Sequence, residues 1–225
     1  MKPTLKSRVF LIPLLILFFS CKKDSSKIDQ NLIYQKLSIE YDINTDITSI
    51  SASFREEKSN GKLLELSDGS TVTINGKSPK TSGAIYEISE PGNIGSISIV
   101  FKDTEGKSYS NILELPSYIS LSNKVYVEKS KNMNWTFYGD SLKANEQVDI
   151  YLTNYNDDTQ SSTISTNTLG TSSVYVPASK LSSLPDGQTK VVVKKIKTIT
   201  SGNFTSVGGE IEATYTGYND FISLF

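Results

Sequence analysis

The side chains that could carry out chemistry in this chain of 225 residues are few in kind. There is no histidine, and Cys21 is the single cysteine. Serine and cysteine hydrolases need an imidazole beside the nucleophile, and zinc sites are built mainly from histidine and cysteine. Histidine is also the side chain that exchanges protons near neutral pH. The composition therefore excludes most hydrolase mechanisms and leaves carboxylates, amides and phenols as candidate functional groups.

Paired carboxylates are the catalytic arrangement that remains. Glycoside cleavage needs two acids at a fixed separation across the sugar, and the adjacent pairs in this chain are Glu56-Glu57 and Asp157-Asp158. Neighbouring residues of a strand point to opposite faces, and both pairs lie in polar, turn-like sequence. We expect solvated loop charges at these positions, and a carboxylate-dependent glycoside hydrolase is the alternative function.

A calcium site is the metal alternative. Asn154, Asn156, Asp157 and Asp158 carry the oxygen ligands that this hard cation prefers. Their spacing is not that of an EF-hand loop, and asparagine and aspartate side chains also hydrogen-bond to the backbone of turns. The sequence predicts a polar turn here, with no metal and no cofactor.

Tyrosines near strand ends are the candidate ligand contacts. Trp135 and Phe137 alternate with polar neighbours, so both point to one face, which predicts that they fill a core. Tyr138, Tyr155 and Tyr218 fall near predicted strand ends, where we expect exposed rings. These three tyrosines form the predicted ligand-binding set.

The amino terminus has the layout of a secretory signal peptide over residues 1–20. Lys2, Lys6 and Arg8 precede an apolar run over residues 9–19. This run is shorter than the roughly 20 residues that a membrane-spanning helix needs. We therefore expect a segment that exports the chain and is then removed.

Cys21 follows this segment directly, and a lone thiol in an exported protein has no disulfide partner within the chain. The residues before it resemble a lipobox, and residues 20–24 resemble the start of outer-membrane lipoproteins of the Bacteroidota. The resemblance implies a lipid on Cys21, a membrane partner reached through that lipid, and a location at the outer membrane in either leaflet. The polar composition predicts a flexible tether over residues 21–29.

The mature chain is mildly acidic. Loss of the three signal-peptide cations lowers Lys plus Arg from 23 to 20 against 24 acids, a net charge of −4. Phosphate binding needs a clustered basic face, so we expect no nucleic-acid partner. The densest basic run, residues 190–197, interleaves lysines with valines and predicts a strand whose lysines face solvent.

Apolar residues that recur with a period of two predict an all-β chain. Each alternating group places its apolar side chains on one face of a strand: Leu37, Ile39, Tyr41 and Ile43; Val72 and Ile74; Ile97, Ile99 and Phe101; Val148, Ile150 and Leu152; Ile211, Ala213 and Tyr215. Glycine-containing pairs such as Asn75-Gly76 supply the hairpin turns between strands. Leu181 and Leu184, after Pro177, leave room for about one helical turn.

Many short strands with regular turns predict antiparallel sandwiches. Pro116 ends strand pairing, so we divide the chain into two sandwich domains, residues 30–121 and 122–225. The predicted hairpin at residues 101–109, and the segment 181–187 that precedes a core strand, resemble parts of immunoglobulin-like or fibronectin-type modules. This resemblance implies an architecture and not an activity.

The function expected from these features is that of a non-catalytic, lipid-anchored envelope protein. The missing catalytic side chains argue against an enzyme, and the strand-rich, exported chain is typical of binding modules. Its sandwich domains would serve as a binding, adhesion or accessory module for a polysaccharide or a partner protein.

Overall fold

The chain folds almost entirely into β-strands. The computed structural model describes residues 23–67, 69–122, 126–218 and 220–225. Strands take up 57% of the structure and helices 6%, which confirms the predicted all-β class. The predicted signal peptide and Cys21 lie outside the described residues. No helix in the described part of the chain is long and apolar enough to cross a membrane.

The first half of the chain consists of β-strands and two 3-10 helices. In chain order these are β1 (Lys23–Asp24), η1 (Ser25–Lys27), η2 (Gln30–Leu32), β2 (Ile33–Asp42), β3 (Ile47–Glu56), β4 (Leu63–Glu65), β5 (Thr71–Ile74), β6 (Lys80–Ser82), β7 (Ile85–Pro91), β8 (Ser96–Lys102) and β9 (Ser108–Glu114). Buried residues alternate with more exposed ones along β2, β5 and β8. The alternation predicted for these segments is confirmed.

The second half consists of β-strands and one short helix. Its elements are β10 (Ser120–Leu121), β11 (Tyr126–Val127), β12 (Met133–Tyr138), β13 (Glu146–Asn154), β14 (Asp157–Thr166), β15 (Ser173–Val176), α1 (Ala178–Ser182), β16 (Gly187–Ile199), β17 (Gly209–Thr216) and β18 (Asp220–Leu224). Helix α1 confirms the predicted helical turn, and it buries Leu181 in the core of this half.

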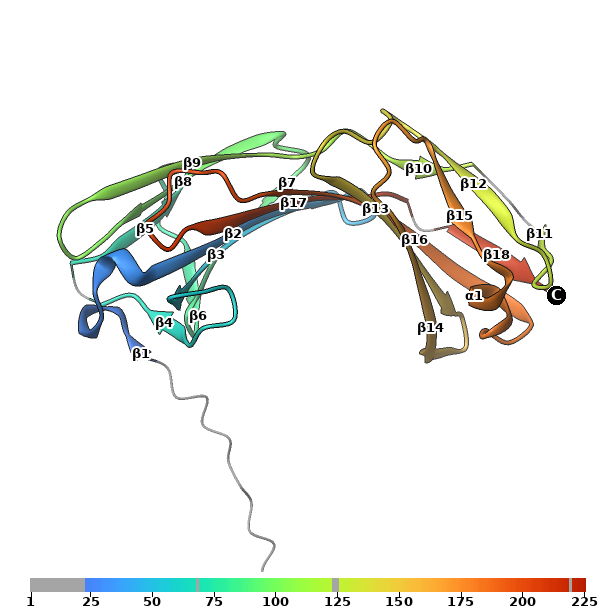
Figure 1. Cartoon of the computed structure of the whole chain (residues 1–225), viewed down its shortest axis with the longest axis horizontal. Coiled ribbons are helices and arrows are strands. Elements are labelled where there is room, and N and C mark those ends of the chain that lie inside the picture. The colour runs from blue at the N-terminus through green and yellow to red at the C-terminus, as the bar shows by residue number, and fades with distance from the viewer. Residues whose placement is uncertain (1–22, 68, 123–125, 219) are drawn as a thin grey trace, which may run out of the picture.

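One large mixed sheet runs through both halves of the molecule (Figure 1). Its main path is β1-β4-β3-β2-β17-β16-β13-β14, with β7 and β6 joined at β3 and with β18 and β11 joined at β16. A three-stranded sheet, β5-β8-β9, covers it in the first half, and a second, β10-β12-β15, covers it in the other. The pairings β1/β4, β2/β17 and β11/β18 are parallel. The large sheet is therefore mixed, whereas the sequence predicted purely antiparallel sheets.

A buried apolar cluster lies between the sheets of each half. In the first cluster, the rings of Phe54 and Phe101 pack with their centroids 4.5 Å apart. The second cluster contains Trp135, which is 4% exposed, together with Phe137. The predicted burial of Trp135 and Phe137 is confirmed.

Strand β17 takes part in both halves. It pairs in parallel with β2 along its length and antiparallel with β16. Ile211 and Ala213 lie in the first cluster, whereas Tyr215 and the β2 residue Tyr41 lie in the second. Residues from both sides of the predicted boundary at residue 121 therefore contribute to each cluster, because a late segment of the chain returns to the first half.

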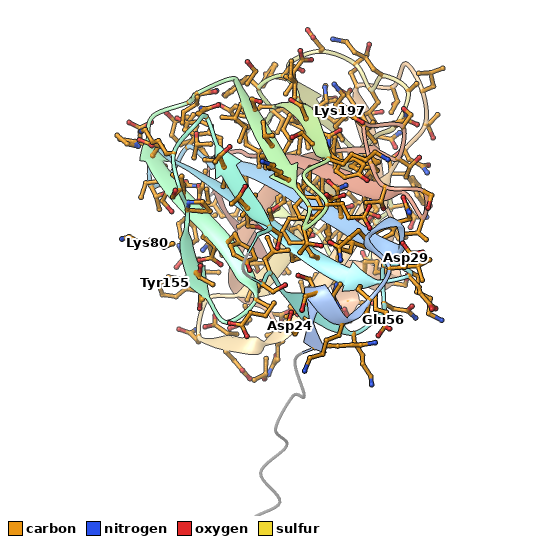
Figure 2. All side chains as sticks on the ribbon, turned by 90° about the vertical axis from the view of Figure 1, so that its left-hand side faces the viewer. Asp24, Asp29, Glu56, Lys80, Tyr155 and Lys197 are labelled. Atoms are coloured by element: carbon orange, nitrogen blue, oxygen red, sulfur yellow. The ribbon has the colours of Figure 1, made fainter. Side chains whose placement is uncertain are left out.

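The amino-terminal residues of the described chain pack against the first half. Strand β1 pairs with β4, and Lys23 Nζ lies 2.6 Å from Glu56 Oε1. Ser25 is fully buried, with its Oγ 3.0 Å from that of Ser67. Figure 2 shows Asp24 and Glu56 close to the place where the described chain begins. From Lys23 onward the chain thus differs from the flexible tether predicted for residues 21–29, because its polar side chains find partners that composition cannot reveal.

Lys195 departs from the lysine-bearing solvent face predicted for residues 190–197. It shares the core-facing side of β16 with Val191 and Val193 and is fully buried. Its Nζ lies 3.2 Å from Glu146 Oε2 and donates hydrogen bonds to Ser117 Oγ at 2.9 Å and to the carbonyl oxygen of Asp140 at 3.1 Å. The prediction is wrong for Lys195 because a carboxylate and two further acceptors satisfy the buried ammonium.

Candidate functional site

A pocket in the second half brings together two of the three candidate tyrosines. It has a volume of about 520 Å³ and is lined by Tyr118, Ser120, Leu121, Ser122, Tyr138, Tyr218 and Asp220. We call it the tyrosine pocket. Small-molecule sites typically enclose about 300 to 1,000 Å³ and combine apolar or aromatic walls with a few polar groups. The volume of the tyrosine pocket lies within this range, and its lining combines three aromatic rings with serine hydroxyl groups and one carboxyl group.

Strand pairing between β10 and β12 places one wall of the pocket. Ser120 lies opposite Tyr138, and Leu121 lies opposite Phe137. Because side chains alternate along a strand, Phe137 enters the core while Tyr138 points outward and stays 59% exposed. The same alternation that buries Phe137 therefore presents Tyr138 to the pocket.

Two glycines allow the segment that carries Tyr118 to approach its neighbours closely. A Cβ atom on Gly139 would collide with the carbonyl oxygen of Tyr118, and one on Gly217 would collide with that of Ile119. Gly139 also has a φ of +111°, which side-chain-bearing residues rarely adopt. These close approaches hold Tyr118 between the two strand ends that carry Tyr138 and Tyr218.

A chain of aromatic contacts supports the pocket from behind. Tyr118 meets Tyr215 edge-on with ring centroids 5.7 Å apart, and Tyr215 meets Tyr41 in the same way at 5.3 Å. Burial raises the pKa of Tyr215, and the neighbouring phenols of Tyr118 and Tyr218 add to this effect. Edge-to-face pairs of this kind contribute about 0.5–1.5 kcal/mol beyond their buried area. Tyr118 is thus fixed to the core while remaining partly exposed.

Asp220 is the one acidic side chain in the described lining of the pocket. It opens strand β18 opposite Val191, which fixes its backbone. Burial raises the pKa of its carboxyl group above the usual value. Within the described residues, the structure gives its side chain no hydrogen bond and no ion pair.

The third candidate tyrosine lies apart from the pocket lining. Tyr155 sits in the turn between β13 and β14 and is as exposed as Tyr138, whereas Tyr218 is 54% exposed. The Tyr155 ring contacts Phe221 edge-on with centroids 5.8 Å apart. The structure therefore groups Tyr138 with Tyr218 in the pocket lining. Tyr155 instead contacts β18 at Phe221, the residue that follows Asp220.

In the described chain, the exposed aromatic side chains all follow β9. Among the described residues, those with large exposed area are Tyr118, Tyr126, Tyr138, Tyr155, Tyr175, Tyr218, Phe221 and Phe225. In the first half the exposed large apolar side chains are Ile47, Ile85 and Ile112. The exposed rings of the described chain therefore lie on the same side of β9 in the sequence as the tyrosine pocket.

The polar cluster considered for calcium closes a hairpin. Asn154 Oδ1 accepts a hydrogen bond from the backbone of Asn156 at 2.7 Å, and Asp157 Oδ1 accepts from the backbone and hydroxyl of Thr159 at 3.0 and 2.6 Å. Asp158, in β14, is exposed. In the described chain no three His, Cys, Asp or Glu side chains are grouped as metal ligands. The cluster has the hydrogen bonds of an Asx-type turn.

The adjacent acid pairs lie outside the tyrosine pocket. Glu56 Oε1 accepts a hydrogen bond from Lys23, and Glu57 is an exposed turn residue. Hydrogen bonds from Thr159 and Gln160 hold the pKa of Asp157 below its usual value. A glycosidase acid needs a raised pKa and a second carboxyl group across the sugar. Neither pair lines the tyrosine pocket, so neither supplies a second carboxyl group there.

Sequence reasoning missed Tyr118 and Asp220. Tyr118 lies two residues before the short strand β10, and Asp220 is the first residue of β18. Single aromatic or acidic residues at strand ends do not by themselves indicate a site. Their chemistry becomes visible only when β10, β12 and the β17–β18 connection are brought together. No protein-family model and no curated protein matches this chain.

Proposed function

We propose that this protein is a non-catalytic lipoprotein of the outer membrane, anchored through Cys21, that binds a polysaccharide in the tyrosine pocket. The observation that carries the proposal is the convergence of Tyr118, Tyr138 and Tyr218 around one pocket. These residues come from three separate segments, and all three rings are exposed.

The chemistry of the lining suits a sugar. A tyrosine ring offers an apolar face to the C–H groups of a pyranose, and its hydroxyl group can exchange hydrogen bonds with sugar hydroxyls. Ser120, Ser122 and Asp220 supply further donors and acceptors around the rings. Sites of this kind combine apolar contact with a few placed polar groups, which orient the ligand.

The same lining supports binding over catalysis. The chain has no histidine, and the described wall of the pocket holds Asp220 without a second carboxylate. General acid–base cleavage of a glycoside requires two such groups in defined roles. A pocket with three phenols and one acid is suited to hold a saccharide and leave it intact.

Affinity electrophoresis tests the binding proposal. Gels containing a soluble β-glucan, a mannan or partly deacetylated chitin should retard the protein, and Tyr138→Ala should weaken retardation by about tenfold or more. Tyr175→Ala is the matched control, because Tyr175 is 57% exposed but lies outside the pocket lining. Equal losses in the two variants, or no retardation by any of the three polysaccharides, would contradict the proposal.

Metabolic labelling with a fatty acid tests the anchor. The sulfur of Cys21 is the acylation site in the proposal, and no other cysteine can replace it. Cys21→Ala should therefore abolish labelling, whereas Lys22→Ala should keep it. Labelling that persists in Cys21→Ala would show that the protein is not anchored in this way.

A further inference from the structure

Among the described residues, the carboxylate of Asp220 has no counter-charge in the tyrosine pocket. Its side chain is partly buried, and the described part of the chain provides it with no hydrogen bond and no ion pair. Three lysines of the second half pair with other acids: Lys129 with Asp186, Lys194 with Glu40, and Lys195 with Glu146. No ion pair joins Lys190, the neighbour of Val191 on β16, to Asp220 across the β16/β18 pairing. The pocket therefore presents an acid that its described surroundings do not neutralise.

Such an arrangement is unfavourable for the free protein. Taking a charged group out of water costs free energy unless a partner compensates, and burial raises the pKa of Asp220 accordingly. The backbone of Asp220 pairs with Val191, so the residue cannot leave the pocket without disrupting the start of β18. A ligand that brings a positive charge would remove this cost on binding.

The aromatic walls favour the same kind of ligand. Tyrosine rings attract cations through the negative potential of their faces, most strongly where water is displaced. A protonated amine can donate charge-assisted hydrogen bonds to a carboxylate, and these are about twice as strong as bonds between neutral groups. A neutral sugar residue satisfies the rings but leaves the charge of Asp220 without a counter-ion.

We infer that the tyrosine pocket recognises a protonated amino sugar, with Asp220 as the counter-ion of its ammonium group and with Tyr138 and Tyr218 as aromatic walls. This inference rests on the proposed function and narrows its ligand class from polysaccharides in general to those that carry free amines.

Calorimetry with two matched oligosaccharides tests the inference. The probes are a glucosamine hexamer, which carries amines that can be protonated, and the N-acetylglucosamine hexamer, which has the same backbone but neutral amides in their place. At about pH 6, where an amino-sugar amine is largely protonated, the wild-type protein should bind the glucosamine hexamer about tenfold more tightly. This preference should shrink as the pH rises and the amine loses its proton.

Asp220→Asn is the deciding variant, because it removes the charge and keeps the shape. It should bind both hexamers with the affinity that the wild type shows for the N-acetylated one. Asp186→Asn is the matched control: Asp186 is an exposed acid paired with Lys129, and its loss should leave the preference unchanged. Lys124→Ala should also keep the preference. This second control shows whether the preference depends on the lysine at position 124 and not on the charge of the ligand.

Thermal unfolding checks that Asp220→Asn remains folded. The variant should melt at the same temperature as the wild type or higher, because it loses an uncompensated partly buried charge. A marked drop in melting temperature would show that Asp220 has an internal partner and would overturn the inference.

The outcomes separate this inference from the proposed function. Equal affinity of the wild type for the two hexamers, or a preference that survives in Asp220→Asn, overturns the amine recognition and leaves polysaccharide binding intact. Failure of the protein to bind either hexamer or any of the three polysaccharides overturns both.

Discussion

Ile211 in β17 lies opposite Leu37 in β2, and both side chains are buried in the first apolar cluster. The pairing joins the beginning of the described chain to a segment near its end. Strand β17 thereby fills the position beside β2 that no strand from the first half occupies. Folding of the first half is thus coupled to the presence of the second.

A fragment of residues 23–121 should not fold by itself. It lacks β17, so one edge of β2 loses its pairing and the first cluster loses Ile211 and Ala213. We expect the circular dichroism of the fragment to show no cooperative transition in urea, whereas residues 23–225 should show one. A cooperative transition in the fragment would mean that the first half is an independent domain.

Point substitutions test the same contact in the intact protein. Ile211→Ala should lower the free energy of unfolding by about 2–5 kcal/mol, because it leaves a cavity in the first cluster. Ile112→Ala, at an exposed isoleucine of β9, should change it by less than about 0.5 kcal/mol. Denaturant titration compares the two, and similar losses would contradict the assigned role of β17.

The buried pair of Lys195 and Glu146 should be costly to break on one side. Lys195→Met leaves the Glu146 carboxylate buried without its cation, and losing one partner of a buried pair costs about 3–5 kcal/mol. The double variant Lys195→Met with Glu146→Leu should recover most of that loss. Lys194→Met is the control, because its pair with Glu40 is partly exposed and should contribute no more than about 1 kcal/mol. If Lys195→Met lowered the free energy of unfolding as little as Lys194→Met, the role assigned to the buried pair would be wrong.

Trp135 should report on the second core. Trp135→Ala should cost about 3–5 kcal/mol through lost burial and a cavity. Its indole nitrogen has no hydrogen-bond partner among the described residues, so Trp135→Phe should cost clearly less. Because Trp135 is the single tryptophan, native emission should be blue-shifted and unchanged by added oligosaccharides. Emission typical of exposed indole, or quenching by a bound sugar, would place Trp135 at the site.

The hydrogen bond from Tyr41 to Asp46 should make stability depend on pH at the alkaline end. The Tyr41 hydroxyl donates to Asp46 Oδ1 at 2.9 Å, and this bond, with burial as a smaller cause, raises the pKa of Tyr41 from 10.0 to about 12. A raised pKa means that folding favours the protonated phenol. The stabilising contribution of the hydrogen bond between Tyr41 and Asp46 is therefore complete below about pH 10 and is lost as the pH rises to about 12.

Urea midpoints measured from about pH 9 to about pH 12 check this expectation. The difference in stability between the wild type and Tyr41→Phe should narrow over the upper part of that range, because the variant has no phenolic proton to lose. A constant difference across the range would show that Tyr41 titrates normally in the folded protein.

The sequence alone determined the faces of individual strands. Period-two alternation predicted the buried side of β2, β8 and β13, and it placed Trp135 and Phe137 in the core. These predictions succeed because the pleat of a strand is local, so neighbouring residues decide which side chains point together. The missing histidines likewise limited the available chemistry before any fold was known.

Only the tertiary structure decided which strands meet. The return of β17 to β2, the burial of Lys195 against Glu146, and the meeting of Tyr118, Tyr138 and Asp220 in one pocket all join segments far apart in the chain. The local pattern of a strand shows which of its faces is buried, but it does not name the distant strand that will pair with it, because that choice depends on packing across the whole sheet. The candidate residues could therefore be found one at a time from the sequence, but the site they form required the fold.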